Sequence, residues 1–293
     1  MTAGYDIDAL KGFFHRIRQA VSSGFFPDTC FSCSAFIETD RWEGIDTGPP
    51  DFNRLVNETP ERIFEVIMAP VLCSACKADF DPVAGPMCER CGMPFISRAA
   101  GDHLCGRCIS AETTRGGPFI AARAFGQHSG ALMKLVHAYK YYGKTGLGKP
   151  LGTLLHICFR QHFGHVPLDL ITPVPLHRQK LVKRGFDQVA HMLYYWPWEN
   201  SAAGKRAANG TVFAGSLLKR VKNTDTQTGL DRWQRGKNVK NAFAVCDRAF
   251  VEKKRILLVD DVYTTGATLE ECALALNRAG AAAVYCLTLS RTL

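Results

Sequence analysis

A pair of adjacent aspartates followed by a threonine-rich turn is the segment of this sequence with the clearest capacity for chemistry. Asp260 and Asp261 follow the apolar run Ile256–Val259, and the turn Thr264–Thr268 leads into a segment of helical character. The apolar run is typical of a central strand that is buried on both faces. Because ligands of open α/β sheets bind at the carboxyl ends of strands, we expect the aspartates and the turn to meet a ligand there.

The residue types of this segment suit a phosphorylated sugar. Free N–H groups at the start of a helix, together with the positive end of its dipole, form an anion site. Gly266 tolerates a positive φ and lets the backbone approach a phosphate, and the neighbouring threonine hydroxyls add donors. The two carboxylates can accept hydrogen bonds from vicinal sugar hydroxyls and can help to hold Mg²⁺. The alternative is an ordinary strand–helix turn with Thr268 as its N-cap, which leaves two adjacent carboxylates at a buried strand end unexplained.

Eight of the twelve cysteines form Cys-x-x-Cys pairs, which supply a second kind of chemistry. The pairs are Cys30/Cys33, Cys73/Cys76, Cys88/Cys91 and Cys105/Cys108. Two such pairs provide the ligands of a tetrahedral structural zinc, so the set predicts one or two zinc ions and leaves open which pairs share a metal. An iron–sulfur cluster and redox-active dithiols are the competing interpretations. The regular pair spacing favours zinc, and an all-cysteine site without an open coordination position indicates a structural role.

The elements that position these residues fall into an α/β pattern with a largely parallel sheet, which begins near residue 118. Strands are expected near Phe119–Phe125, Leu168–Thr172, Ser216–Val221, Ala242–Val245, Ile256–Val259 and Val284–Leu289. Helices are expected near Gly130–Tyr141, Leu147–Gln161, Asp187–Tyr195, Leu230–Asn238 and Thr268–Ala279. The stretch Trp198–Thr211, rich in Ala, Gly and Asn, is predicted to be a loop.

The chain divides into three parts on this pattern. Residues 1–29 carry apolar side chains at helical spacing and predict an amphipathic N-terminal helix. Residues 30–117 hold all four cysteine pairs and are expected to form a small zinc-binding region that needs its metal for stability. Residues 118–293 form the α/β domain.

Composition narrows the class of protein. The sequence has no apolar stretch near the ~20 residues of a membrane span and no leader-like N-terminus, so a cytoplasmic protein is expected. In that compartment the thiols stay reduced, which argues against a disulfide framework. The formal net charge of +9 suits polyanionic partners such as nucleic acid or pyrophosphate, and it suits mere solubility equally well.

The run Leu258–Thr268 resembles the motif by which type I phosphoribosyltransferases bind phosphoribosyl pyrophosphate (PRPP) together with Mg²⁺. The resemblance implies the fold of that family, a mostly parallel sheet flanked by helices. It further implies that Asp260 and Asp261 contact the ribose hydroxyls. The 5-phosphate would be wrapped by Thr264, Thr265, Gly266, Ala267 and Thr268.

Two further runs of sequence indicate which family within this group the chain resembles. Pro173–His177 with the following Arg184-Gly185-Phe186, and the basic run Arg220–Phe243, join the cysteine pairs and the PRPP motif in resembling the ComF family of ComFC- and GntX-like proteins. This implies a pyrophosphate loop at Val174, Pro175, Leu176 and His177, and a mobile loop over Arg220–Asn238. Arg178, Arg184, Arg232 and Arg235 are the available cations, and Asp260, Asp261 and Arg235 form the expected catalytic set. The chain departs from the family at Asp187, where Asn is expected, and in the long interval between its first two cysteine pairs.

One motif is a false lead. Gly143–Lys149 superficially resembles a phosphate-binding P-loop, but Ala138 stands where that pattern needs its first glycine, and no strand precedes the segment. We therefore expect a loop between two helices there and no nucleotide triphosphatase site.

Three functions fit these features. The first is a PRPP-binding protein of natural transformation, with single-stranded DNA and the competence machinery as partners. Tyr139, Lys140, Tyr141, Tyr142 and Lys144 could stack on bases, although packing is the more common role of such tyrosines. The second is a true phosphoribosyltransferase with an unidentified acceptor, and the third is a non-catalytic PRPP sensor. The intact acidic pair favours an enzyme without deciding the matter.

Overall fold

A seven-stranded sheet forms the centre of the computed structural model, which describes residues 29–37, 52–97, 99–115, 117–201, 204–206, 210–222 and 239–293. The strand order is β1-β9-β8-β2-β5-β4-β3. The first five run parallel; their bounds are Ala121–Gln127 (β1), Ala283–Arg291 (β9), Arg255–Tyr263 (β8), Leu170–Pro173 (β2) and Val212–Phe213 (β5). The predicted class, an α/β fold with a mostly parallel sheet and a cysteine-rich N-terminal region, is confirmed.

Strand β8 is buried on both faces, as its apolar sequence predicts. Leu257 and Val259 belong to one core, and Ile256 and Leu258 belong to the other, because successive side chains of a strand point to opposite faces. The strand is longer than expected, since its pairing with β9 continues to Tyr263. The two aspartates therefore lie within the strand rather than after it, which corrects the sequence expectation.

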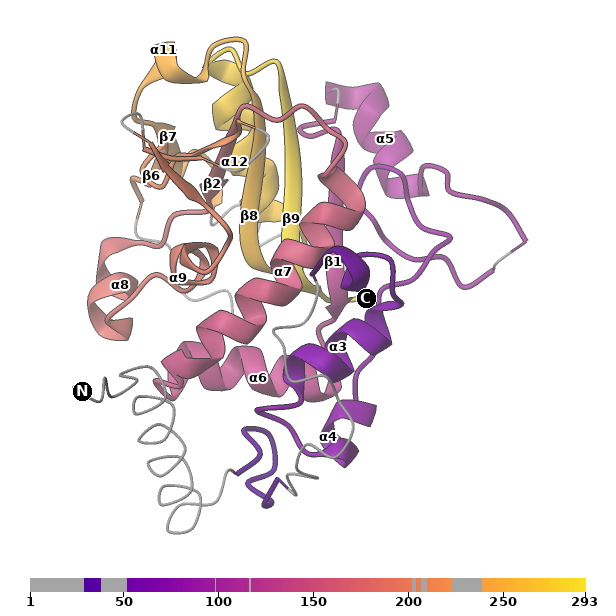
Figure 1. Cartoon of the computed structure of the whole chain (residues 1–293). Coiled ribbons are helices and arrows are strands. Elements are labelled where there is room, and N and C mark those ends of the chain that lie inside the picture. The colour runs from indigo at the N-terminus through magenta and orange to yellow at the C-terminus, as the bar shows by residue number, and fades with distance from the viewer. Residues whose placement is uncertain are drawn as a thin grey trace, which may run out of the picture.

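Helices cover both faces of the sheet (Figure 1). On one face lie α6 (Gly130–Tyr141), α7 (Gly148–Phe163) and α9 (Gln188–Tyr194), and on the other lies α12 (Ala267–Arg278). All four helices were predicted within a few residues of these bounds. Between α6 and α7 the false P-loop is a connection with the short 3-10 helix η1 (Thr145–Leu147), as expected.

The cysteine-rich region contains helices that the sequence analysis did not predict. They are α2 (Phe52–Leu55), α3 (Pro60–Met68), α4 (Ser74–Ala78) and α5 (Gly106–Arg115). Helix α3 begins at a proline, and the Thr59 side chain caps it by accepting from the Arg62 N–H. Its buried face shares one core with α6 and α7, and Phe64 stacks on Phe80 at 4.1 Å between ring centroids.

Two sequence predictions beyond the central strands need separate comment. The expected loop at Trp198–Thr211 is wrong in part, because β3 (Glu199–Ser201) and β4 (Gly204–Arg206) form an antiparallel extension of the sheet next to β5. Hydrogen bonds between backbones stabilise these strands, and the amino-acid composition of the segment does not reveal such pairing. The expected strands at 216–221 and 242–245 exist as β6 (Leu218–Arg220) and β7 (Phe243–Val245), which pair in a separate small sheet.

Some predictions lie outside the described residues or stay untested. The helices expected at 1–29 and Leu230–Asn238 fall on residues that the structure does not describe. The domain boundaries near residues 29 and 117 remain predictions. Among the helices in the described part of the chain, none has the length and apolar character needed to cross a lipid bilayer.

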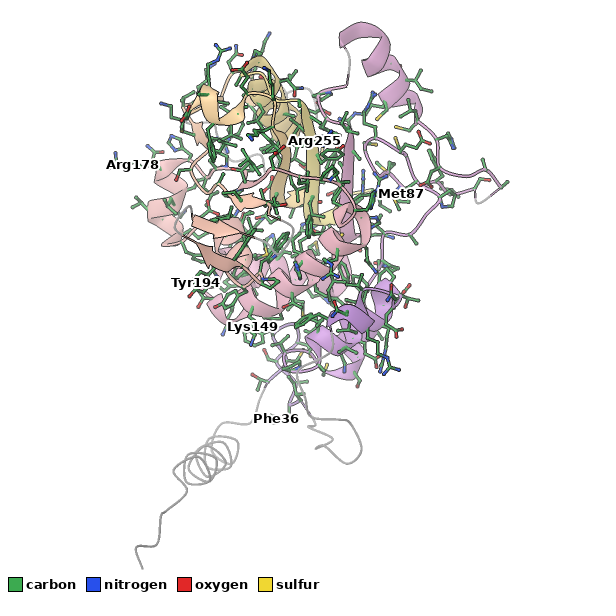
Figure 2. All side chains as sticks on the ribbon, turned by 45° about the horizontal axis from the view of Figure 1, so that its top comes forward. Phe36, Met87, Lys149, Arg178, Tyr194 and Arg255 are labelled. Atoms are coloured by element: carbon green, nitrogen blue, oxygen red, sulfur yellow. The ribbon has the colours of Figure 1, made fainter. Side chains whose placement is uncertain are left out.

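Figure 2 shows the cysteine-rich segment around Met87 and the helix α8 (Arg178–Arg184) on opposite sides of the sheet. Figure 1 agrees, with α5 beside β1 and α8 beyond β2. The ends of β8 and β2 lie between these two regions, and the candidate site is found there.

Candidate functional site

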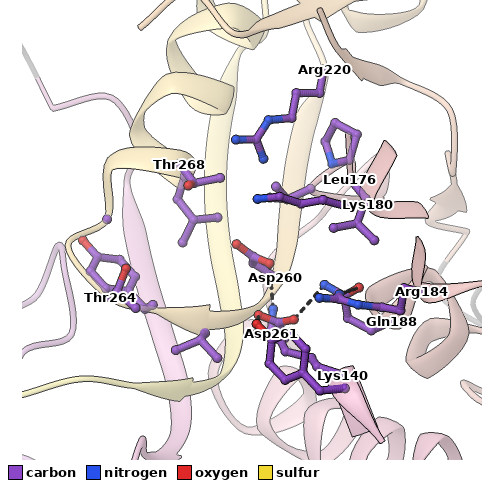
Figure 3. Close-up of a pocket in the computed structure, with 17 residues that line it drawn as sticks. Lys140, Leu176, Lys180, Arg184, Gln188, Arg220, Asp260, Asp261, Thr264 and Thr268 are labelled. Atoms are coloured by element: carbon purple, nitrogen blue, oxygen red, sulfur yellow. Dashed lines mark hydrogen bonds and ion pairs between the residues drawn. The ribbon is translucent and has the colours of Figure 1, made fainter. Parts of the chain in front are cut away.

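A cavity of about 330 Å³ opens at the carboxyl ends of β2 and β8 (Figure 3). Its wall brings together residues from α6, α8, α9, β6, β8 and α12 and from the turns that follow β2 and β8. They are Lys140, Tyr141, Val174, Pro175, Leu176, Lys180, Arg184, Gln188, Arg220, Asp260, Asp261, Val262, Tyr263, Thr264, Gly266, Thr268 and Leu269. This is the position where open α/β sheets bind ligands.

Asp261 is a buried carboxylate that protein groups already engage. Only 5% of the residue is exposed. Its Oδ1 lies 2.8 Å from Lys140 Nζ, and its Oδ2 accepts a 2.8 Å hydrogen bond from Gln188 Nε2. Asp261 thus ties the end of α6 and the start of α9 to the strand that carries the site.

Asp260 differs from its neighbour, because its carboxyl faces the cavity (Figure 3). Its Oδ1 accepts a 2.8 Å hydrogen bond from the Asp261 N–H. Loss of hydration, reinforced by the negative charge of Asp261, raises the pKa of Asp260 to about 8, although Lys140 opposes the rise. The unliganded site therefore favours the protonated carboxyl at neutral pH, and a bound cation would favour its ionised form.

The turn between β8 and α12 has the backbone shape of an anion site. Gly266 is the N-cap of α12 and has φ of 85°. A Cβ at this position would lie 2.4 Å from Tyr263 Oη, so both the conformation and the space require glycine. Thr264 and Thr268 line the cavity beside the N-terminus of this twelve-residue helix. Backbone donors, hydroxyls and the helix dipole therefore converge on one point.

Cationic side chains face the aspartates from the other side of the cavity. Lys180 comes from α8 and Arg220 from the end of β6, and Figure 3 shows both extending toward Asp260. The Arg220 guanidinium lies over the Phe243 ring at 5.3 Å, and burial lowers the pKa of Arg220. Arg184 lines the same wall and donates to Gln188.

The structure brings most of the expected PRPP-site residues into this wall: Asp260, Asp261, Thr264, Gly266, Thr268, Val174, Pro175, Leu176 and Arg184. Three others have different positions. His177 Nδ1 accepts from the Gln179 N–H and caps α8, and Thr265 Oγ1 accepts from the Ala267 N–H within the turn. His177, Thr265 and Ala267 therefore do not line the cavity. Arg235 lies outside the described residues.

Sequence reasoning missed the roles of four lining residues: Lys140, Lys180, Gln188 and Arg220. Lys140 was grouped with the tyrosines beside it, Arg220 was counted only as the first residue of a basic run, and Lys180 was given no role. A charged residue at the end of a helix with an apolar face was the available signal for Lys140. For Gln188 no local signal existed, because its partner is 73 residues away in the chain.

The eight paired cysteines form two separate groups. The first cysteine site contains Cys30, Cys33, Cys73 and Cys76; the second cysteine site contains Cys88, Cys91, Cys105 and Cys108. Within each group all four sulfurs lie within 4.8 Å of one another, and no disulfide forms. The Cys33–Cys73 and Cys91–Cys105 sulfur distances are 3.7 and 3.8 Å. Thiolates arranged tetrahedrally at bonds of about 2.3 Å stand about 3.8 Å apart, so both sites fit zinc.

One thiol in each group is poised to ionise. Burial opposes ionisation of Cys88, but the N–H groups of Cys105 and Cys91 point at its sulfur and lower its pKa to about 6. The same balance of burial and backbone donors lowers the pKa of Cys30 to about 6. Backbone N–H groups that donate to the ligand sulfurs are usual in structural metal sites, and they favour the thiolate that zinc requires.

Comparison with known families supports the metal assignment. Residues 66–109 match the model of the double zinc ribbon domain. The match spans the last three cysteine pairs, and the geometry adds the Cys30 pair to the first site. Together these findings support structural zinc in both sites and answer which pairs share a metal.

Relatives cover most of the chain. Competence protein F of Haemophilus influenzae is 31% identical over 218 residues, which is 71% of this chain and 85% of the relative. The DNA utilization protein YhgH of Escherichia coli K12 is 31% identical over 217 residues, with the same two coverages. Competence protein ComFC of Streptococcus pneumoniae is 24% identical over 221 residues, covering 75% of this chain and 87% of the relative.

A solved structure of the allosteric regulatory enzyme of purine biosynthesis aligns with 52% of this chain and 29% of its own, at 20% identity and a TM-score of 0.31. That likeness is too loose to bear on the site. The relatives of about 31% identity, matched over most of their length, decide the family. The chain belongs to the ComF family, the family of competence protein F.

Proposed function

We propose that this protein binds PRPP with Mg²⁺ in the cavity at the ends of β2 and β8, and that it serves the handling of DNA. The observation that carries the proposal is the convergence of a phosphate-binding turn, an acidic group and two cations on one cavity of about 330 Å³. PRPP carries a 5-phosphate, vicinal hydroxyls and a pyrophosphate, and each of these groups has a matching part of the wall.

The turn Thr264–Thr268 takes the 5-phosphate. Its glycine conformation exposes backbone N–H groups at the start of α12, and the Thr264 and Thr268 hydroxyls lie in the same wall. Gly266 has the left-handed conformation that this arrangement of N–H groups requires.

The acidic pair takes the ribose. Asp260 supplies the direct contact with the hydroxyls, since its carboxyl faces the cavity. Asp261 contributes its remaining lone pairs and holds the base of the site through Lys140 and Gln188. The two aspartates therefore have different duties, one in recognition and one in positioning.

The cationic side takes the pyrophosphate. Lys180 and Arg220 supply positive charge, and the backbone at Val174–Leu176 approaches from the end of β2. Mg²⁺ would be held by Asp260 together with phosphate oxygens, because this ion prefers hard oxygen ligands and usually binds as a complex with phosphates. Bound there, it would neutralise charge on the pyrophosphate and favour the ionised form of Asp260.

The link to DNA comes from the relatives and from the rim of the cavity. Two relatives are named for competence and for DNA utilization. Tyr141, which lines the cavity, is 59% exposed, and Arg184 lies over its ring at 5.5 Å; the next residue, Tyr142, is 72% exposed. Exposed aromatic rings beside cations are the usual platform for single-stranded nucleic acid. We therefore place single-stranded DNA as the macromolecular partner.

Equilibrium dialysis tests the proposal. Full-length, zinc-loaded protein is dialysed against PRPP with and without Mg²⁺, and pyrophosphate release is followed in the same samples. Retention of PRPP in a one-to-one ratio supports binding, and release in the presence of a nucleobase or other acceptor would add turnover. Absence of retention by folded protein would overturn the PRPP site. Affinity for single-stranded oligonucleotide that falls steeply with salt would support the DNA partner, and no binding at low salt would remove it.

A further inference from the structure

The second cysteine site touches both ends of the phosphate-binding turn through two arginines. The turn lies between Tyr263, the last residue of β8, and Glu270, in the first helical turns of α12. Arg291 links the site to Tyr263, and Arg107 links it to Glu270. Neither contact was expected from the sequence, because the partners lie far apart in the chain.

The first link is an arginine buried in the protein. Arg291, at the end of β9, is 1% exposed. Its Nη1 donates a 2.6 Å hydrogen bond to the carbonyl of the ligand residue Cys91, and its Nη2 lies 3.7 Å from the Met93 sulfur. Its guanidinium carbon lies 4.9 Å from the centre of the Tyr263 ring. A buried guanidinium is costly without such partners, so its position depends on the shape of the chain around the metal site.

Tyr263 passes this contact to the turn. Its ring is packed beneath Gly266, where a Cβ would lie within 2.4 Å of the tyrosine oxygen. The tyrosine is 2% exposed. The Tyr263 ring thus contacts the Arg291 guanidinium and also lies against the backbone of Gly266.

The second link joins a ligand loop to the helix that follows the turn. Arg107 stands between Cys105 and Cys108, and its Nη2 forms an ion pair with Glu270. The Glu270 N–H in turn donates a 2.8 Å hydrogen bond to the Gly266 carbonyl, which closes the first turn of α12. The ion pair is about two-thirds buried, so solvent screens it less than a surface pair.

The second cysteine site is itself docked firmly on the sheet. Gly92, directly after Cys91, has φ of 69°, and a Cβ there would lie 2.4 Å from the Ala122 carbonyl on β1. The Ala122 N–H donates a 2.6 Å hydrogen bond to the Arg90 carbonyl. The ligand loop thus packs backbone to backbone against the edge strand of the sheet.

The first cysteine site has the same ligands and different neighbours. Phe31, beside Cys30, bonds through its N–H to Val71 and lies 5.8 Å from Lys144 Nζ, at the junction of α6 and α7. Among the contacts of the described residues, none joins this site to the turn Thr264–Thr268. The first cysteine site therefore serves as an internal control: it has the same kind of ligands but does not contact the turn.

We propose that Arg291 and Arg107 are positioning residues through which the folded second cysteine site holds the phosphate-binding turn in its anion-binding shape. The first cysteine site supports only the core around α3 and α7. This inference rests on the proposed function for its ligand, but the positioning itself can be observed without ligand.

Two single-ligand variants test it in the full chain. Cys105→Ser and Cys33→Ser each remove one accessible ligand, and zinc content is measured to confirm the loss of one ion from each. Cys105→Ser is expected to speed amide exchange at residues 262–270 and to weaken ribose 5-phosphate binding by about tenfold, because the support behind the turn is lost. Cys33→Ser is expected to leave both within about twofold of the wild type. Equal effects of the two variants on the turn would overturn the proposal.

A milder pair of variants covers the case in which Cys105→Ser fails to fold. Arg107→Ala breaks the ion pair with Glu270, and Arg62→Ala breaks the exposed pair with Glu65 on α3, at 2.6 Å. Faster exchange of the turn in Arg107→Ala alone, with both zinc ions retained and with partial recovery in Arg107→Lys, supports the role. Unchanged exchange in Arg107→Ala contradicts it. If the wild type binds no ribose 5-phosphate, the proposed function fails while the exchange measurements still decide the positioning.

Discussion

The two walls of the cavity are built in different ways. The loop wall comprises the end of β8, the turn Thr264–Thr268 and α12; its backbone lies over buried residues such as Leu269 and Cys272. The cationic wall comprises α8 and the end of β6. Helix α8 buries none of its residues, and its Val182 is 77% exposed. The loop wall is thus part of the core, whereas α8, which carries Lys180 of the cationic wall, stands outside it.

This difference assigns different tasks to the two walls. A backbone site fixed by packing can select a group of constant shape, such as a 5-phosphate on a ribose. Long side chains on a peripheral helix can adjust to a pyrophosphate whose metal and conformation vary, at the cost of ordering them on binding. Recognition of ribose 5-phosphate should therefore depend on the loop wall alone, and PRPP should need both.

The largest effect is expected from the carboxylate that anchors the loop wall. Asp261→Ala should lower the free energy of unfolding by about 3 kcal/mol, because it removes both the ion pair with the largely buried Lys140 side chain and the hydrogen bond from Gln188. Chemical denaturation measures this loss. Glu65→Ala is the control; it breaks an exposed ion pair with Arg62 and should cost less than about 1 kcal/mol. Similar losses in the two variants would show that Asp261 is no anchor.

The next effect separates recognition from anchoring. Asp260→Asn should reduce PRPP affinity with Mg²⁺ by about 100-fold, because a charged acceptor and metal ligand is lost. Without ligand the same variant should melt at a higher temperature than the wild type at pH 9, where the ionised Asp260 carboxylate destabilises the folded state. Equilibrium dialysis measures the PRPP affinity, and thermal melts measure the melting temperature at pH 9. A variant that binds normally, or that melts lower at pH 9, would argue against the assignment of Asp260.

A smaller effect should appear on the cationic wall. Lys180→Met should weaken PRPP and pyrophosphate by about 30-fold, while ribose 5-phosphate stays within about twofold, because only the pyrophosphate meets this side chain. Arg178→Met, an exposed position on the same helix outside the cavity wall, serves as the control and should change neither. Loss of ribose 5-phosphate binding in Lys180→Met would abolish the distinction between the walls.

The smallest effect is a dependence on pH. Affinity for PRPP should rise about tenfold from pH 7 to pH 9 as Asp260 ionises, since its pKa in the free protein is about 8. The phosphates of the ligand are already ionised over most of this range. The contribution of Asp260 to folding has the opposite sign. Its folded pKa exceeds its unfolded pKa, so that contribution is lost as the pH rises from about 4 to 8. Titration with PRPP at several pH values checks the predicted rise in affinity, and the affinity of the Asp260→Asn variant should not change with pH.

The loop wall could be predicted from the sequence because it is one contiguous segment. A strand, two acids, a turn and a helix follow one another between Ile256 and Ala279, so local patterns contain most of its structure. The strand's true end at Tyr263 was missed, since it depends on pairing with β9. The cysteine ligands could likewise be predicted from their spacing, but the structure was needed to show which pairs share a site.

The cationic wall and the supports behind the site could not be predicted in this way. Lys140 reaches Asp261, and Arg291 reaches Cys91, across separations in sequence that no local pattern spans. Lys180 and Arg220 lie in basic runs, and nothing local distinguishes them from exposed neighbours such as Arg178 and Lys222. His177 was assigned to the predicted pyrophosphate loop, and its capping of α8 could not be predicted because the helix itself was not expected.

Calorimetric titration of the zinc-loaded protein with PRPP, in the presence and absence of Mg²⁺, tests the central claim most directly. We expect one binding site per chain, with an affinity that Mg²⁺ strengthens and that Asp260→Asn nearly abolishes. Folded wild-type protein that takes up no PRPP, or an Asp260→Asn variant that takes it up as well as the wild type, would contradict the account.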